Sequence, residues 1–228
     1  MDFEVLNDPD TVAKRAAAVI AAVAHDAIAA RSKFAIAVSG GRAPWVMLRE
    51  LANEPLPWDK VHIFQVDERV APAGDPDRNL THLRESFLDR ASFPKENLHA
   101  MPVLDDDLEF GAEQYSRTLQ MTAGTPPVLD LVHLGLGPDG HTASLIPGDP
   151  VLDIIDRDVA TTGVYQGRRR MTLTYPILNR SRKILWLITG ADKKSPLEKM
   201  RNADASIPAG RIRRDQALIL ADRSAAGE

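Results

Sequence analysis

The residues best suited to chemistry lie in a glycine-rich segment near the middle of the chain. Residues 135–140 are Gly-Leu-Gly-Pro-Asp-Gly, and His141 follows them directly. An imidazole beside a carboxylate can serve as a general base near neutral pH, so His141 and Asp139 are candidate catalytic residues. A histidine by itself is usually structural. The sequence has six histidines, however, and only His141 lies in a glycine-rich loop that follows an apolar run.

The same segment also satisfies the G-x-G-x-x-G pattern of dinucleotide-binding proteins. That interpretation requires a long crossover helix directly after the glycines. Here Pro147 and Gly148 end any such helix after one or two turns. We therefore expect no bound dinucleotide.

A second glycine-rich loop, residues 39–44 (Ser-Gly-Gly-Arg-Ala-Pro), separates an apolar run from a predicted helix. Glycines leave backbone N–H groups accessible, and a helix N-terminus carries partial positive charge, so Gly40, Gly41 and Arg42 are candidate phosphate ligands. The alternative is a tight turn that uses glycine for its positive φ. The loop lacks the Lys-Ser/Thr ending of a nucleotide P-loop, which argues against a nucleoside triphosphate.

Charged residues follow directly after two further apolar runs, or a few positions later. Asp67 and Arg69 follow residues 61–66, and Lys193 follows residues 183–190 at the start of a predicted helix. A cation at a helix N-terminus is locally unfavourable, so an anionic partner would explain Lys193. Arg170 ends a run of three arginines and opens a strand-like segment, so its side chain is expected to point differently from its neighbours. For each of these residues the alternative is a solvated surface charge.

We expect no metal ion. The chain has no cysteine, no H-E-x-x-H motif and no pair of histidines four residues apart on one predicted helix face. The carboxylates of residues 105–107 are more simply interpreted as the favourable acidic start of a helix at residue 108.

These candidates follow short apolar runs at residues 34–41, 61–66, 129–137 and 183–190. Helical patterns lie between them or precede them, at residues 9–30, 79–88, 108–121 and 193–201. Apolar strands that alternate with helices predict an α/β fold with a parallel sheet covered on both faces. Ligands of such sheets bind beyond the carboxyl ends of the strands. We expect one domain over residues 1–228, with its first core strand near residue 35.

The composition of the chain argues against some classes of binding partner. The formal net charge of −4 argues against nucleic acid, whose phosphates are normally met by a basic surface. A small anion needs only a few local cations. No apolar run is long enough to cross a membrane, and the acidic start of the chain does not resemble a secretory signal. The absence of cysteine favours a reducing, cytoplasmic setting.

Five segments together resemble, in order and spacing, the 6-phosphogluconolactonase family. They are SGGRAP at 39–44, VDERVAP at 66–72, GLGPDGHTASLIPG at 135–148, RMTLTYPIL at 170–178 and ITGADKK at 188–194. The resemblance covers about residues 35–226. It implies a Rossmann-like α/β/α sandwich with a mainly parallel sheet, similar to that of ribose-5-phosphate isomerase and glucosamine-6-phosphate deaminases.

The resemblance also implies an activity: hydrolysis of 6-phospho-D-glucono-1,5-lactone to 6-phospho-D-gluconate in the oxidative pentose phosphate pathway. His141 would be the general base that takes a proton from water, with Asp139 and Asp67 as further site residues. No cofactor or metal is implied, and the partner is a small sugar-phosphate lactone. Other positions match those associated with the phosphate and the sugar acid, namely Gly40, Gly41, Arg69, Arg170 and Lys193.

Two alternatives stay open. Glucosamine-6-phosphate deaminases have a similar loop but continue with an aromatic residue and a glutamate, where this chain has Thr-Ala-Ser-Leu at residues 142–145. Non-catalytic sugar-phosphate sensors of transcription regulators are also similar, but they normally carry an attached helix-turn-helix. Here mainly one alanine-rich helix precedes the first expected core strand.

One departure from the family concerns the phosphate loop. The family usually has a small hydroxyl residue and a threonine after the paired glycines, whereas this chain has Arg42 and Ala43. Arg42 either contacts the phosphate or points into solvent. We expect a monomer or a homodimer.

Overall fold

Seven strands form one parallel sheet in the computed structural model, which describes all 228 residues. Their spatial order is β1-β10-β9-β6-β2-β3-β5, and every neighbouring pair is parallel. The predicted α/β class is confirmed, and so are the four predicted apolar strands. The strands are β1 (Asp2–Leu6), β2 (Phe34–Val38), β3 (Val61–Gln65), β5 (Leu98–His99), β6 (Leu131–Leu134), β9 (Ile184–Ile188) and β10 (Ala217–Asp222).

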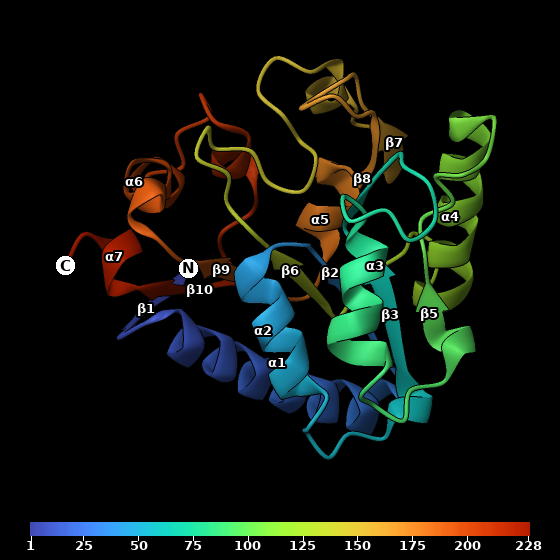
Figure 1. Ribbon diagram of the computed structural model, residues 1–228, viewed down its shortest axis with the longest axis horizontal. Coiled ribbons are helices and arrows are strands. Elements are labelled where there is room, and N and C mark those ends of the chain that lie inside the picture. Colours follow the sequence, from blue (N-terminus) through green and yellow to red (C-terminus); the bar gives the residue numbers. More distant parts are fainter.

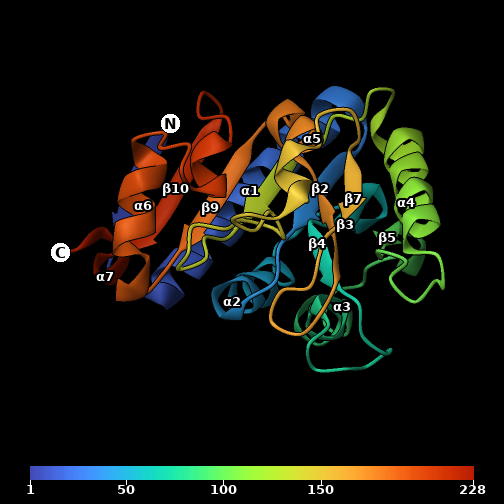
Figure 2. The same cartoon turned by 90° about the horizontal axis from the view of Figure 1, so that it is seen from above.

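Helices cover both faces of this sheet (Figure 1). The long α1 packs against α2, and α2 lies beside α3 (Figure 2). A π-helical turn, Arg84–Leu88, continues α3. None of the helices combines the length and the apolar character that a membrane span requires. The helices are α1 (Pro9–Arg31), α2 (Arg42–Leu51), α3 (Asn79–Leu83), α4 (Leu108–Ala123), α5 (Tyr175–Arg180), α6 (Lys194–Arg201) and α7 (Arg223–Ala226).

The sheet separates two hydrophobic cores because successive side chains of a strand point to opposite faces. In β2, Ala35 and Ala37 belong to the core that contains α4, α5 and α6. Phe34, Ile36 and Val38 belong to the core that contains α1 and α2. Strands buried on both faces explain why the sequence shows mainly apolar runs without a regular polar alternation.

A small antiparallel sheet lies beside the main one. It consists of β4 (Asp67–Arg69), β8 (Arg170–Leu173) and β7 (Val159–Thr161), in that order. The strands predicted from the sequence do not include residues 67–69, and this omission is wrong. These residues form a short strand because they pair with residues 170–172, about a hundred positions later in the chain.

The expectation that the first core strand lies near residue 35 is also wrong. β1 begins at Asp2 and pairs with β10 along five residues, from Asp2 with Leu218 to Leu6 with Asp222. The two ends of the chain consequently lie on the same side of the molecule (Figures 1 and 2).

Aspartate side chains cap the starts of two helices. Asp8 caps α1 by accepting a hydrogen bond from the Thr11 amide at 2.7 Å, and Pro9 occupies the first turn. Asp107 caps α4 by accepting from the amides of Glu109 and Phe110. Both caps satisfy N–H groups that have no partner within their own helix.

Candidate active site

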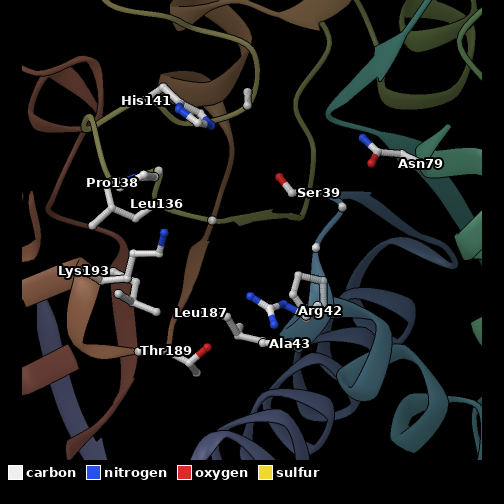
Figure 3. Close-up of a pocket in the computed structure, with 18 of the residues that line it drawn as sticks. Ser39, Arg42, Ala43, Asn79, Leu136, Pro138, His141, Leu187, Thr189 and Lys193 are labelled. Carbon is white, nitrogen blue, oxygen red and sulfur yellow. The ribbon is translucent and has the colours of Figure 1, made fainter. Parts of the chain in front are cut away.

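Loops that follow four strands meet at one edge of the main sheet and enclose a cleft of about 620 Å³. The segments come after β2, β3, β6 and β9, and Figure 3 shows their side chains arranged around a common space. This is the edge where an α/β sheet normally binds its ligand. The cleft brings together every candidate residue except Asp139, which lies directly behind His141: Gly40, Gly41, Arg42, Asp67, Arg69, His141, Arg170 and Lys193.

His141 and Asp139 form a hydrogen-bonded pair at the wall of the cleft. Nδ1 of His141 lies 2.6 Å from Oδ1 of Asp139, and the same oxygen accepts the backbone N–H of His141 at 3.1 Å. Burial opposes ionisation of Asp139, but the hydrogen bonds and charge of His141 outweigh it and hold the pKa of this carboxyl below its usual value. An ionised Asp139 requires a proton on Nδ1. In the neutral imidazole this tautomer leaves Nε2 as the acceptor, and Nε2 has no hydrogen-bond partner in the protein.

Two glycines of this loop have neighbours so close that no side chain fits there. A Cβ at residue 137 would lie 2.2 Å from Nδ1 of His141, so no side chain fits there. Gly140 has a φ of +84°, and a Cβ on it would lie 2.5 Å from the Ile207 side chain. Gly137 and Gly140 of the G-x-G-x-x-G pattern therefore serve a tight turn that presents His141. No crossover helix follows it, as the sequence predicts.

Asp67 is buried at the base of the cleft. Its Oδ2 accepts the Ser144 hydroxyl at 2.7 Å, and its Oδ1 accepts the Asn79 amide at 3.3 Å. Asn79 also donates to the Asp67 carbonyl at 2.9 Å. These hydrogen bonds from Ser144 and Asn79 hold both carboxylate oxygens of Asp67 in place.

Glu68, next to Asp67, points away from the cleft and is completely buried. It forms an ion pair with the buried Arg78 at 3.1 Å and accepts the backbone N–H groups of Arg69 and Asn79 at 2.8 Å each. A buried carboxylate is stable only when it is paired and hydrogen-bonded, as here. Glu68 thus ties β4 to the start of α3, and both elements contribute residues to the cleft.

Arg69 and Arg170 are cross-strand partners in the small sheet. Arg69 donates to the Asp77 carbonyl at 2.7 Å, but the Nε atoms of both arginines are buried and have no hydrogen-bond partner. Burial and the neighbouring Arg69 both lower the pKa of Arg170. Two adjacent guanidinium groups with unused donors form a site suited to an anion.

Arg42 and Lys193 provide positive charge at other sides of the cleft (Figure 3). Arg42 has no hydrogen bond or ion pair, and Figure 3 shows its guanidinium pointing into the cleft. Lys193 lies 2.8 Å from Asp192. Its hydrogen bond, together with the charge of Arg42, lowers the pKa of Asp192. Arg42 therefore lines the cleft while its side chain stays exposed to solvent.

The loop between β2 and α2 leaves its backbone accessible. Gly41 has a φ of +133°, a conformation that favours glycine, and α2 begins at the next residue without a side-chain cap. The first N–H groups of α2 belong to residues that line the cleft, and they have no partner within the helix. At Gly40 a Cβ would lie 2.0 Å from the Asn79 side chain, so this glycine is required by packing as well.

Sequence reasoning missed Tyr165, whose hydroxyl donates to Oδ2 of Asp139 at 3.1 Å. No local pattern connects two residues that are 26 positions apart. The sequence did predict that the side chain of Arg170 points differently from those of its neighbours. Arg170 is buried in the cleft, whereas Arg168 forms ion pairs with Asp75 and Asp77 outside it. No group of three or more His, Asp or Glu side chains has the arrangement of a metal site.

Comparisons with known proteins agree with this geometry. Residues 7–220 match the family model described as glucosamine-6-phosphate isomerases/6-phosphogluconolactonase. A 6-phosphogluconolactonase from Synechocystis sp. is 39% identical over 198 residues, which cover 85% of this chain and 82% of that protein. One from Mycobacterium tuberculosis is 34% identical over 240 residues, covering 99% and 97%.

A solved structure supports the same assignment. The 6-phosphogluconolactonase of Thermotoga maritima superposes with a TM-score of 0.86 at 27% sequence identity, covering 97% of this chain and 98% of the other. The chain belongs to the glucosamine-6-phosphate isomerase/6-phosphogluconolactonase family.

Proposed function

We propose that this protein is a 6-phosphogluconolactonase. It hydrolyses 6-phospho-D-glucono-1,5-lactone to 6-phospho-D-gluconate in the oxidative pentose phosphate pathway. The observation that carries the proposal is the His141–Asp139 pair, joined at 2.6 Å, on the wall of a cleft that also contains four cationic side chains. Relatives that align over most of the chain are named for the same activity.

The geometry supports a general-base mechanism. Nε2 of His141 accepts a proton from water as the water oxygen attacks C1 of the lactone. The tetrahedral intermediate collapses when the bond from C1 to the ring oxygen breaks, and His141 returns the proton to that oxygen. Asp139 keeps Nδ1 protonated and stabilises the imidazolium between the two steps. Water is consumed, and the new carboxylic acid then loses a proton to solvent.

Asp67 and the cations bind the substrate in this proposal. Asp67 accepts hydrogen bonds from sugar hydroxyls and helps to orient the ring. Guanidinium groups bind phosphate through two parallel hydrogen bonds, whereas a lysine acts as a movable point charge. The phosphate and the developing sugar acid are held by the backbone of Gly40 and Gly41 and by Arg42, Arg69, Arg170 and Lys193.

Several further proposals concern the whole protein. Residues 1–228 form a single domain, which is supported by the pairing of β1 with β10 from the opposite end of the chain. The partner is a small molecule and neither nucleic acid nor a membrane. Catalysis uses His141, Asp139 and water, without a metal or cofactor. We expect a cytoplasmic monomer or homodimer, and light scattering after size-exclusion chromatography distinguishes these two states.

The decisive experiment is an assay on freshly prepared 6-phosphogluconolactone, with the spontaneous hydrolysis subtracted. His141→Ala should lower kcat by about 10²- to 10⁴-fold, the usual contribution of a general base. Asp139→Asn should lower it in the same direction, because an amide can donate to Nδ1 and favour the wrong tautomer. A folded His141→Ala protein with nearly wild-type kcat would show that His141 is not the base.

The same preparation separates the alternatives. Ammonia release from glucosamine 6-phosphate would indicate a deaminase. Tight binding of 6-phosphogluconate without any turnover of the lactone would indicate a sensor. A lactonase that uses the cationic side chains should also discriminate strongly against unphosphorylated glucono-1,5-lactone.

A further inference from the structure

A hairpin tip from the small sheet reaches the catalytic pair. Residues 165–168 form a two-residue turn in which Tyr165 and Arg168 exchange backbone hydrogen bonds at 2.9 and 3.2 Å. Gln166 and Gly167 have φ values of +50° and +78°. Two successive positive φ values are typical of the turn that matches the twist of paired strands. The tip is therefore a defined element, which the sequence did not reveal.

Tyr165 makes three contacts from this tip. Its hydroxyl donates to Oδ2 of Asp139 at 3.1 Å, on the carboxylate oxygen that His141 does not use. Its ring packs edge-on against the His141 ring, with centroids 5.6 Å apart. The guanidinium of Arg170 lies over the same ring, 5.0 Å from its centroid. One side chain thus joins the catalytic pair to a cation of the cleft.

The two carboxylate oxygens of Asp139 therefore form hydrogen bonds with two different parts of the chain. Oδ1 receives the imidazole and backbone N–H of His141, while Oδ2 receives Tyr165. A carboxylate that is held at only one oxygen can rotate about its Cβ–Cγ bond. The imidazole that is hydrogen-bonded to it then moves as well. Proton transfer depends on geometry within a few tenths of an ångström, so the second hydrogen bond bears on the rate.

We propose that Tyr165 is a positioning residue for lactone hydrolysis: its hydroxyl fixes Asp139 and so the direction of His141 Nε2, and its ring supports Arg170. This inference rests on the proposed function. Tyr165 acts through Asp139, and nothing in its own position requires contact with the substrate.

The tip is itself held in place by ion pairs. Arg168 lies 3.3 Å from Oδ2 of Asp75 and 3.2 Å from Oδ2 of Asp77. The carbonyl of Asp77 accepts Arg69 of the cleft at 2.7 Å. The segment of residues 75–77 therefore anchors the hairpin tip through Arg168 and also holds Arg69 of the cleft.

Two substitutions separate the functions of the hydroxyl and the ring. Tyr165→Phe removes only the hydroxyl and should lower kcat by about threefold to tenfold, less than loss of the base itself, with KM unchanged. Tyr165→Leu also removes the ring beneath Arg170 and should raise KM by about twofold to fivefold in addition. The matched control is Tyr175→Phe, because Tyr175 is a buried tyrosine whose hydroxyl donates to the Pro208 carbonyl outside the cleft.

A second measurement does not depend on turnover. The Nδ1 proton of His141, followed by NMR in the free protein, should exchange with water faster in Tyr165→Phe than in the wild type or in Tyr175→Phe. Unchanged kcat and unchanged exchange in Tyr165→Phe would overturn the proposal, and so would a rise in KM alone. If the wild type does not hydrolyse the lactone, the proposed function fails, while the exchange rate still decides whether Tyr165 positions the pair.

Discussion

At Gly40 the loop backbone passes so close to Asn79 that no side chain fits. An added Cβ would lie 2.0 Å from Oδ1 of Asn79, and Asn79 in turn donates to the carbonyl and carboxylate of Asp67. Gly40→Ala should therefore displace Asp67, lower kcat/KM by more than tenfold and lower the free energy of unfolding by about 1–3 kcal/mol. Steady-state assays and urea unfolding measure the two effects.

Gly135→Ala is the matched control for stability. A Cβ there meets no atom within 4 Å, and the residue does not have a positive φ. Its free energy of unfolding should stay close to that of the wild type. Equal stability of the Gly40→Ala and wild-type proteins would show that Asn79 moves aside without cost.

Individual residues differ in how far the sequence predicts them. Arg170 stands out because it begins a strand, and alternation along a strand sends adjacent side chains in opposite directions. His141 stands out because glycines surround it. Tyr165 carries no comparable signal: its contact with Asp139 exists only after the small sheet has formed.

At the scale of elements, the start of α4 offers a clean test of capping. Asp107 accepts the backbone N–H groups of Glu109 and Phe110, whereas Asp106 forms no hydrogen bond or ion pair. Asp107→Ala should lower the free energy of unfolding by about 1 kcal/mol, and Asp106→Ala should leave it unchanged. Neither should alter kcat, because α4 does not line the cleft. A similar loss in both variants would attribute the effect to charge instead of capping.

Elements with strong local patterns are those the sequence predicts well. β2 and β9 are entirely apolar, and β3 and β6 are mainly so, because these strands are buried on both faces. β1 lies at the edge of the sheet, is partly exposed and has no such pattern. β4 has only three residues and exists because β8 pairs with it, so nothing within residues 67–69 could indicate a strand.

For the whole molecule, topology explains why distant motifs meet. β2 and β6 are adjacent and parallel, but the chain leaves β2 toward β3 and leaves β6 toward β9 on the other side. Loops that diverge from neighbouring strands open a crevice between them, which is where open α/β sheets bind ligands. The glycine loop after β2 and the His141 loop after β6 form that crevice. An overall charge of −4 is thus compatible with a local cluster of cations.

The buried His133 is expected to make the stability of the whole protein depend on pH in the acid range. His133 of β6 is completely buried, its Nδ1 accepts the Ser39 N–H at 3.2 Å, and burial lowers its pKa to about 3. The unfolded chain binds this proton below about pH 6.5 but the folded protein does not, so stability must fall as the pH drops from there toward 3.

We expect His133 to contribute a slope of about 1 kcal/mol per pH unit between pH 4 and 6. Urea unfolding at several pH values measures it. His133→Gln keeps an acceptor for Ser39 but does not titrate, so its stability should depend less steeply on pH, even if it is lower at pH 7. His25→Gln, at an exposed position on α1, should keep the wild-type slope. An unchanged slope in His133→Gln would mean that the folded protein protonates His133 as readily as the unfolded chain does.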